Sequence, residues 1–87
     1  MKKLMQRVEM VATHHADGIF DPVRFRVEDK EQERFVIYVD KVLHRYEVRT
    51  AGQRTVNFRC RSTVNSAYRL YELAYEPATC TWYLSKW

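Results

Sequence analysis

Arg54-Thr-Val-Asn-Phe-Arg-Cys-Arg61 decides the fold, because its side chains alternate strictly between apolar and polar. Val56, Phe58 and Cys60 fall on one face of an extended chain, and polar residues fall on the other. Such alternation is typical of a β-strand that buries one face. We therefore expect a half-buried strand here, and the same test applied along the chain gives the rest of the fold.

The preceding segment, residues 44–50, alternates in the same way, and a short connection over residues 51–53 separates the two. Its glycine can supply the positive φ that a hairpin needs. A two-residue loop would place Val48 opposite Thr55, an apolar residue opposite a polar one, whereas a three-residue loop places Val48 opposite Val56. Because a slip of one residue moves every side chain to the other face, we expect the three-residue loop.

Further segments show strand character, with a turn at Asp17-Gly18: Gln6–His14, Val23–Val27, Phe35–Val39, 68–75 and 80–87. Phe35–Val39 is mostly apolar and β-branched, which predicts a central, well-buried strand. A short helix over 64–72 competes with the strand at 68–75. The sequence therefore predicts one all-β domain over residues 1–87, a small antiparallel barrel or roll of six or seven short strands.

The composition limits the class of protein. Of the 87 residues, 46% are hydrophobic and 30% are charged, which is enough apolar surface for a core. No apolar run is long enough to span a membrane, and residues 1–7 do not begin a signal peptide. We expect a soluble cytoplasmic protein without a membrane partner. With two glycines in the chain, phosphate-loop and dinucleotide motifs are absent, and we expect no cofactor.

Positive charge is concentrated in residues 41–69, which hold seven Lys and Arg against one Glu. In the expected register, Arg45 faces Arg59 across the outer face of the hairpin, and like charges directly opposite are unfavourable. This predicts an anion nearby: a nucleic-acid backbone, an acidic protein partner, or the chain's own acidic stretch 28–33. The residues we assign to nucleic-acid binding are Arg45, Arg49, Arg59 and Arg61.

Catalytic and metal-binding patterns are weak. The expected register makes His44 and Cys60 neighbours on the inner face, but the sequence shows no third group to orient the histidine. A zinc site could use His44 and Cys60 together with Cys80 and either His14 or His15, but these residues lack the close ligand spacing of such sites. We expect no catalytic, metal-binding or cofactor-binding residue, and therefore no enzyme.

Aromatic residues gather near the C-terminal end. Alternation places Trp82 and Leu84 on one face and Tyr83 and Trp87 on the other. If the first face is core, Tyr83 and Trp87 are available to a partner. The alternative to nucleic-acid binding is therefore a protein-interaction or homo-oligomerisation module, and an open sheet edge would favour a homodimer.

Several spaced motifs carry a resemblance: His15-Ala-Asp17-Gly18, Pro22-Val-Arg24-Phe25-Arg26, Phe58-Arg-Cys60 and Thr79-Cys80-Thr-Trp82-Tyr-Leu84. In these the chain resembles short uncharacterised bacterial all-β proteins that consist of one such domain. The resemblance implies a compact all-β fold, and it supplies no activity, ligand or catalytic residue. From the residues themselves we expect a non-catalytic small β-barrel that acts as a binding module.

Overall fold

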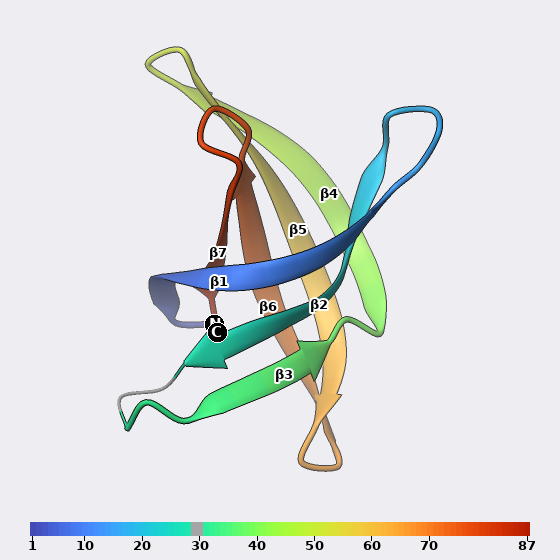
Figure 1. Cartoon of the computed structure of the whole chain (residues 1–87), viewed down its shortest axis with the longest axis vertical. Coiled ribbons are helices and arrows are strands. Elements are labelled where there is room, and N and C mark those ends of the chain that lie inside the picture. Colours follow the sequence, from blue (N-terminus) through green and yellow to red (C-terminus); the bar gives the residue numbers. More distant parts are fainter. Residues whose placement is uncertain (29–30) are drawn as a thin grey trace.

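Seven antiparallel strands form one strongly curled sheet, a half-barrel, in a computed structural model that describes residues 1–28 and 31–87 (Figure 1). The strands are β1 (Lys3–His14), β2 (Phe20–Glu28), β3 (Arg34–Tyr38), β4 (Lys41–Thr50), β5 (Gln53–Val64), β6 (Ala67–Glu76) and β7 (Thr81–Lys86). The predicted all-β class is confirmed. The helix considered over 64–72 does not form, because Asn65 and Ser66 both take positive φ and turn the chain directly from β5 into β6. In the predicted acidic stretch 28–33, Asp29 and Lys30 lie outside the described residues.

The strand order is β3-β2-β1-β7-β6-β5-β4, so two meanders are joined by pairing of β1 with β7. The edge strands β3 and β4 are nevertheless consecutive in the chain, and residues 39–40 alone separate them. The sheet must therefore curl until its two edges meet at one corner. There the amide of Asp40 donates to the carbonyl of Arg61 at 3.0 Å, and the amide of Val39 donates to that of Val23 at 2.9 Å.

The hairpin of β4 and β5 has the register that we did not expect. Ala51 and Gly52 form a two-residue loop with φ of 50° and 80°, so Val48 lies opposite Thr55. Positive φ at both loop residues is the type I′ turn, whose twist matches that of the strands. The prediction of a three-residue loop is wrong because local turn geometry outweighed the apolar pairing that we used to choose it.

The observed register reverses the faces of β4. Arg45 and Glu47 now lie opposite the core residues Phe58 and Val56, while Tyr46 points to the convex side. Side-chain contacts stabilise both the charged residue on the core side and the tyrosine on the convex side. The Arg45 guanidinium lies over the Phe58 ring at 5.4 Å and pairs with a carboxylate of β2, and the Tyr46 hydroxyl donates to a buried carboxylate of β6.

The hydrophobic core lies on the concave side of the half-barrel. Its fully or nearly fully buried members come mainly from β5, β6 and β7: Phe25, Val56, Phe58, Cys60, Tyr71, Leu73 and Leu84. Phe20 packs edge-on against Phe58, Tyr75 and Trp82, with ring centroids 5.2–6.0 Å apart. Such aromatic bulk is how a small domain obtains enough buried apolar area.

Strand β3 is an edge strand, and the prediction that Phe35–Val39 is central is wrong. Phe35, Val36 and Tyr38 are 49%, 52% and 63% exposed. Continuous apolar character usually marks a strand buried on both faces. Here it marks a strand with one face toward the core and its free edge toward a cleft.

Candidate functional site: an apolar cleft beside the edge strand

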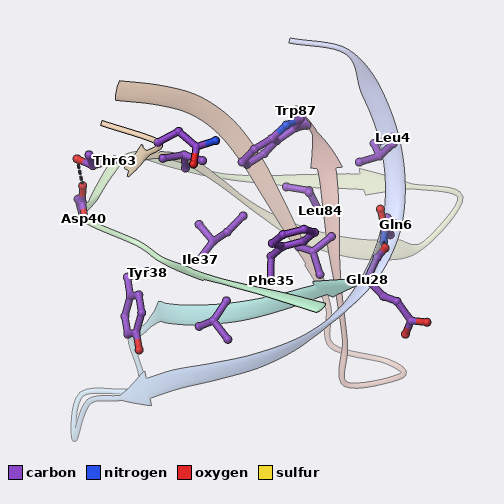
Figure 2. A pocket seen from close by; sticks show the side chains of 14 residues that line it. Leu4, Gln6, Glu28, Phe35, Ile37, Tyr38, Asp40, Thr63, Leu84 and Trp87 are labelled. Carbon is purple, nitrogen blue, oxygen red and sulfur yellow. Dashed lines mark hydrogen bonds between the residues drawn. The ribbon is translucent and has the colours of Figure 1, made fainter. Parts of the chain in front are cut away.

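A cleft of about 530 Å³ opens between β3 and the tip of the β5–β6 hairpin (Figure 2). Its apolar lining comes from four strands and the last residue: Leu4, Val27, Phe35, Ile37, Leu84 and Trp87. Figure 2 shows Phe35, Ile37, Leu84 and Trp87 converging on its centre. The cleft is therefore the gap that remains because the half-barrel does not close between β3 and β5.

A buried hydroxyl fixes one end of this gap. Ser62 is fully buried, and its Oγ donates to the carbonyl of Tyr38 at 2.6 Å. The same Oγ accepts a hydrogen bond from the hydroxyl of Tyr71 at 2.5 Å. Burial raises the pKa of Tyr71 well above its usual range, so this hydroxyl stays a donor. Ser62 thus ties the end of the edge strand to the core, and β3 diverges from the hairpin beyond that tie.

Trp87 forms one wall of the cleft. We had predicted that it shares a face with Tyr83, and this prediction is wrong. The register of β6 against β7 shifts between Leu84 and Lys86, so Ser85 is an extra residue that turns Trp87 back toward the core. The Trp87 ring lies 5.4 Å from that of Tyr71. Tyr83 lies half-buried on the convex side, so these two partner-binding candidates do not form one surface.

Arg69 holds this wall in place. Its guanidinium carbon lies 4.0 Å from the centre of the Trp87 ring, a cation–π contact, and its Nη2 donates to the Trp87 carbonyl at 3.2 Å. A stacked and hydrogen-bonded guanidinium restricts the rotation of the indole. The wall of the cleft is therefore held in position without a ligand.

Polar groups occupy the two ends of the cleft. Thr63 donates to a carboxylate oxygen of Asp40 at 3.0 Å, and Gln6 donates to the backbone carbonyl of Glu28 at 2.5 Å (Figure 2). The Glu28 carboxylate also lies 3.9 Å from Arg34. Among the described residues no Lys or Arg lines the cleft, so its formal charge comes from Asp40 and Glu28.

The four arginines predicted to form one nucleic-acid-binding face are divided between two faces. Arg45 and Arg49 lie on the concave side, where they pair with Asp21 and Glu47. Arg59 and Arg61 lie on the convex side. Arg59 contacts the buried carboxylate of Glu72 at 3.4 Å, and Arg61 stacks on Tyr68 at 5.0 Å. The expected contact between Arg45 and Arg59 does not form, because the register differs.

The residues weighed for catalysis are also apart. Cys60 lies opposite Val42 inside the core, whereas His44 lies opposite Arg59 on the convex side. Burial, with the nearby charge of Glu72, raises the pKa of Cys60 to about 12, so its thiol is neutral and a poor nucleophile. Both cysteines are free, and Cys80 is exposed in the last turn. In residues 1–28 and 31–87 no three metal-ligating side chains come together.

Comparison of the chain with protein-family models, with curated proteins and with solved structures gives no match. Within the part of the chain that the structure describes, no helix is long and apolar enough to cross a membrane. The candidate site therefore rests on geometry alone. Sequence reasoning missed the cleft, although the apolar run Phe35–Val39 carried a signal for it that we interpreted as burial within a sheet.

Proposed function

We propose that the protein is a non-catalytic binding module whose cleft holds a small, largely apolar ligand. The observation that carries this proposal is the cleft itself, since about 530 Å³ lies within the range of roughly 300–1,000 Å³ typical of ligand sites. Its lining matches such sites in kind: apolar side chains at the centre and a few polar groups at the ends. Trp87 and Leu84 supply surfaces that are positioned before any ligand arrives.

The charge of the cleft favours uncharged or cationic ligands. Asp40 and Glu28 place negative charge at its two ends, although the chain as a whole carries +4. Both carboxylates are exposed, so each contributes only ~0.5–1 kcal/mol, or a few-fold in affinity. An apolar chain that ends in an amine or a hydroxyl fits this site better than a fatty-acid carboxylate.

Calorimetric titration with three ligands of equal chain length tests the proposal: dodecylamine and dodecanoate below their micellar concentrations, and dodecanol below its solubility limit. We expect saturable binding in the order amine, alcohol, carboxylate. Phe35→Ala should weaken all three, whereas Val11→Ala, an exposed apolar position outside the cleft, should leave them unchanged. Absence of saturable binding, or tightest binding of dodecanoate, would contradict the proposal.

A second candidate function follows from one pair on the convex face. Lys41 and Arg61 are cross-strand neighbours, and within the described ranges neither forms an ion pair with a carboxylate. Adjacent cations of this kind favour an anionic partner. The nucleic-acid hypothesis therefore keeps Arg59 and Arg61, gains Lys41, and no longer rests on the two arginines of the concave face.

Fluorescence polarisation with labelled single- and double-stranded oligonucleotides tests this second candidate. Replacing both Lys41 and Arg61 with glutamine should lower the salt-dependence slope by about two units on a double strand. The matched control replaces both Arg49 and Arg54, a cross-strand pair on the opposite face, with glutamine and so removes the same two charges. Equal losses in the two variants would show that binding follows net charge and not this surface.

A further inference from the structure

Strand β4 leaves a long free edge. It is ten residues long, pairs with β5 on one side only, and is the last strand in the sheet order. The other edge strand, β3, has five residues, and its end is tied to β5 through Ser62. A long free edge is a template for another strand, and proteins either cover it or pair it.

The turn geometry determines which backbone groups of β4 face that edge. In a two-residue hairpin the pair that flanks the loop, here Thr50 and Gln53, exchanges hydrogen bonds. Because such pairs alternate along an antiparallel ladder, Val48 and Tyr46 also direct their amides and carbonyls toward β5. The backbone groups of Arg45, Glu47 and Arg49 therefore point outward.

The side chains of β4 distinguish between the registers in which a second copy could pair. A two-fold axis through Arg45 would set two arginines opposite each other, and one through Glu47 would set two glutamates opposite each other. With the axis at Tyr46, Arg45 faces Glu47 of the partner subunit, and Glu47 faces the partner's Arg45. This register also makes the outward backbone groups of both residues meet, as an antiparallel ladder requires.

We infer that a second copy of this chain pairs along β4, antiparallel, with Tyr46 on the two-fold axis and two Arg45–Glu47 ion pairs across the junction. The in-chain contacts leave room for these pairs. Arg45 and Glu47 are 38% and 41% exposed at their side chains, and the fork of an arginine can contact Asp21 and a second carboxylate together.

The convex face of the junction is complementary as well. Tyr46 meets the partner's Tyr46, and Val48, which is 41% exposed, meets the partner's His44. Aromatic and aromatic–aliphatic pairs of this kind stabilise neighbouring strands. The extra residue at Leu43 ends the regular part of the strand, so the paired segment is short and the dimer is weak and concentration-dependent.

Sedimentation velocity from about 10 µM to about 1 mM tests the inference. Glu47→Arg places two arginines opposite each other and should weaken dimerisation at least tenfold, and the charge swap Arg45→Glu with Glu47→Arg should restore it. The control is Glu9→Arg, an equal charge reversal on the interior strand β1. Circular dichroism confirms that each variant is folded.

A chain that stays monomeric over this range overturns the inference. A dimer that is unchanged by Glu47→Arg, or one that is lost in Val36→Lys on β3, assigns the contact to another edge and overturns it equally. A purely structural role of Arg45 cannot explain rescue by the charge swap, because the swap also removes the contact of Arg45 with Asp21 in the same chain. None of these outcomes depends on a ligand in the cleft.

Discussion

Ser62→Ala tests how the corner of the half-barrel is held together. The Ser62 hydroxyl is fully buried and bonds both the carbonyl of Tyr38 and the hydroxyl of Tyr71. Alanine removes both hydrogen bonds and leaves the Tyr71 hydroxyl in the core without an acceptor. The edge strand β3 then loses its side-chain tie to β5.

The expected cost follows from the two bonds. A buried polar group left unsatisfied costs about 1–3 kcal/mol, and this applies to Tyr71. The carbonyl of Tyr38 lies at the edge of the sheet, where water can replace the serine hydroxyl. Losing this hydrogen bond therefore costs only its net contribution to stability, ~0.5–1.5 kcal/mol. We expect a total of about 1.5–4.5 kcal/mol, a large share of the roughly 4–13 kcal/mol that stabilises a domain of this size.

Urea unfolding followed by circular dichroism measures this cost, with Tyr71→Phe as the matched variant. The phenylalanine removes the tyrosine hydroxyl together with its need for an acceptor, and Ser62 still donates to Tyr38. Tyr71→Phe should therefore lose only ~0.5–1.5 kcal/mol, and adding it to Ser62→Ala should cause no further loss. Greater destabilisation by Tyr71→Phe than by Ser62→Ala, or a cost of Ser62→Ala below ~0.5 kcal/mol, would show that Ser62 does not hold this corner.

Three further predictions concern the hairpin loop and the two thiols. Ala51→Asn should raise the free energy of unfolding by ~0.5–1 kcal/mol in urea melts, because asparagine tolerates a φ of 50° better than alanine and Asn-Gly favours a type I′ turn. A thiol reagent at pH 8 should modify Cys80 alone in the folded protein, so Cys80→Ser should abolish the reaction until denaturant is added. Stability should fall as the pH rises from about 9 toward 12, by up to ~1.4 kcal/mol per pH unit, because the pKa of Cys60 is about 12 when folded and returns to its ordinary 9.0 on unfolding. Cys60→Ala should remove that part of the alkaline loss, and an unchanged pH profile would show that the thiol does not contribute.

Local patterns predicted the elements well. The alternation in β5 and the turn at Asp17-Gly18 were predicted correctly, because side-chain period and turn chemistry are properties of a few adjacent residues. The predicted register of β4 on β5 was wrong because the register depends on whether Ala51 adopts a left-handed conformation. The observed register is stabilised by contacts from distant strands, above all Asp21 with Arg45 and Glu72 with Tyr46.

The cleft could not be predicted because it arises from a failure of two strands to meet. The apolar run in β3 suits both a central strand and the lip of an open half-barrel, and the strand order alone distinguishes them. The position of Trp87 depended on one extra residue at Ser85, which the sequence does not mark. The errors at β3 and Trp87 therefore came from pairing between strands, whereas the errors at β4 and Trp87 each moved side chains from one face to the other.

Chemical-shift mapping with ¹⁵N-labelled protein and dodecylamine shows whether the cleft is the binding site. We expect saturable shifts for the Trp87 indole and for the amides of Phe35, Ile37, Thr63 and Leu84, with weaker shifts when dodecanoate is used. Shifts confined to the convex face of β4 and β5, or spectra that do not change, would contradict it.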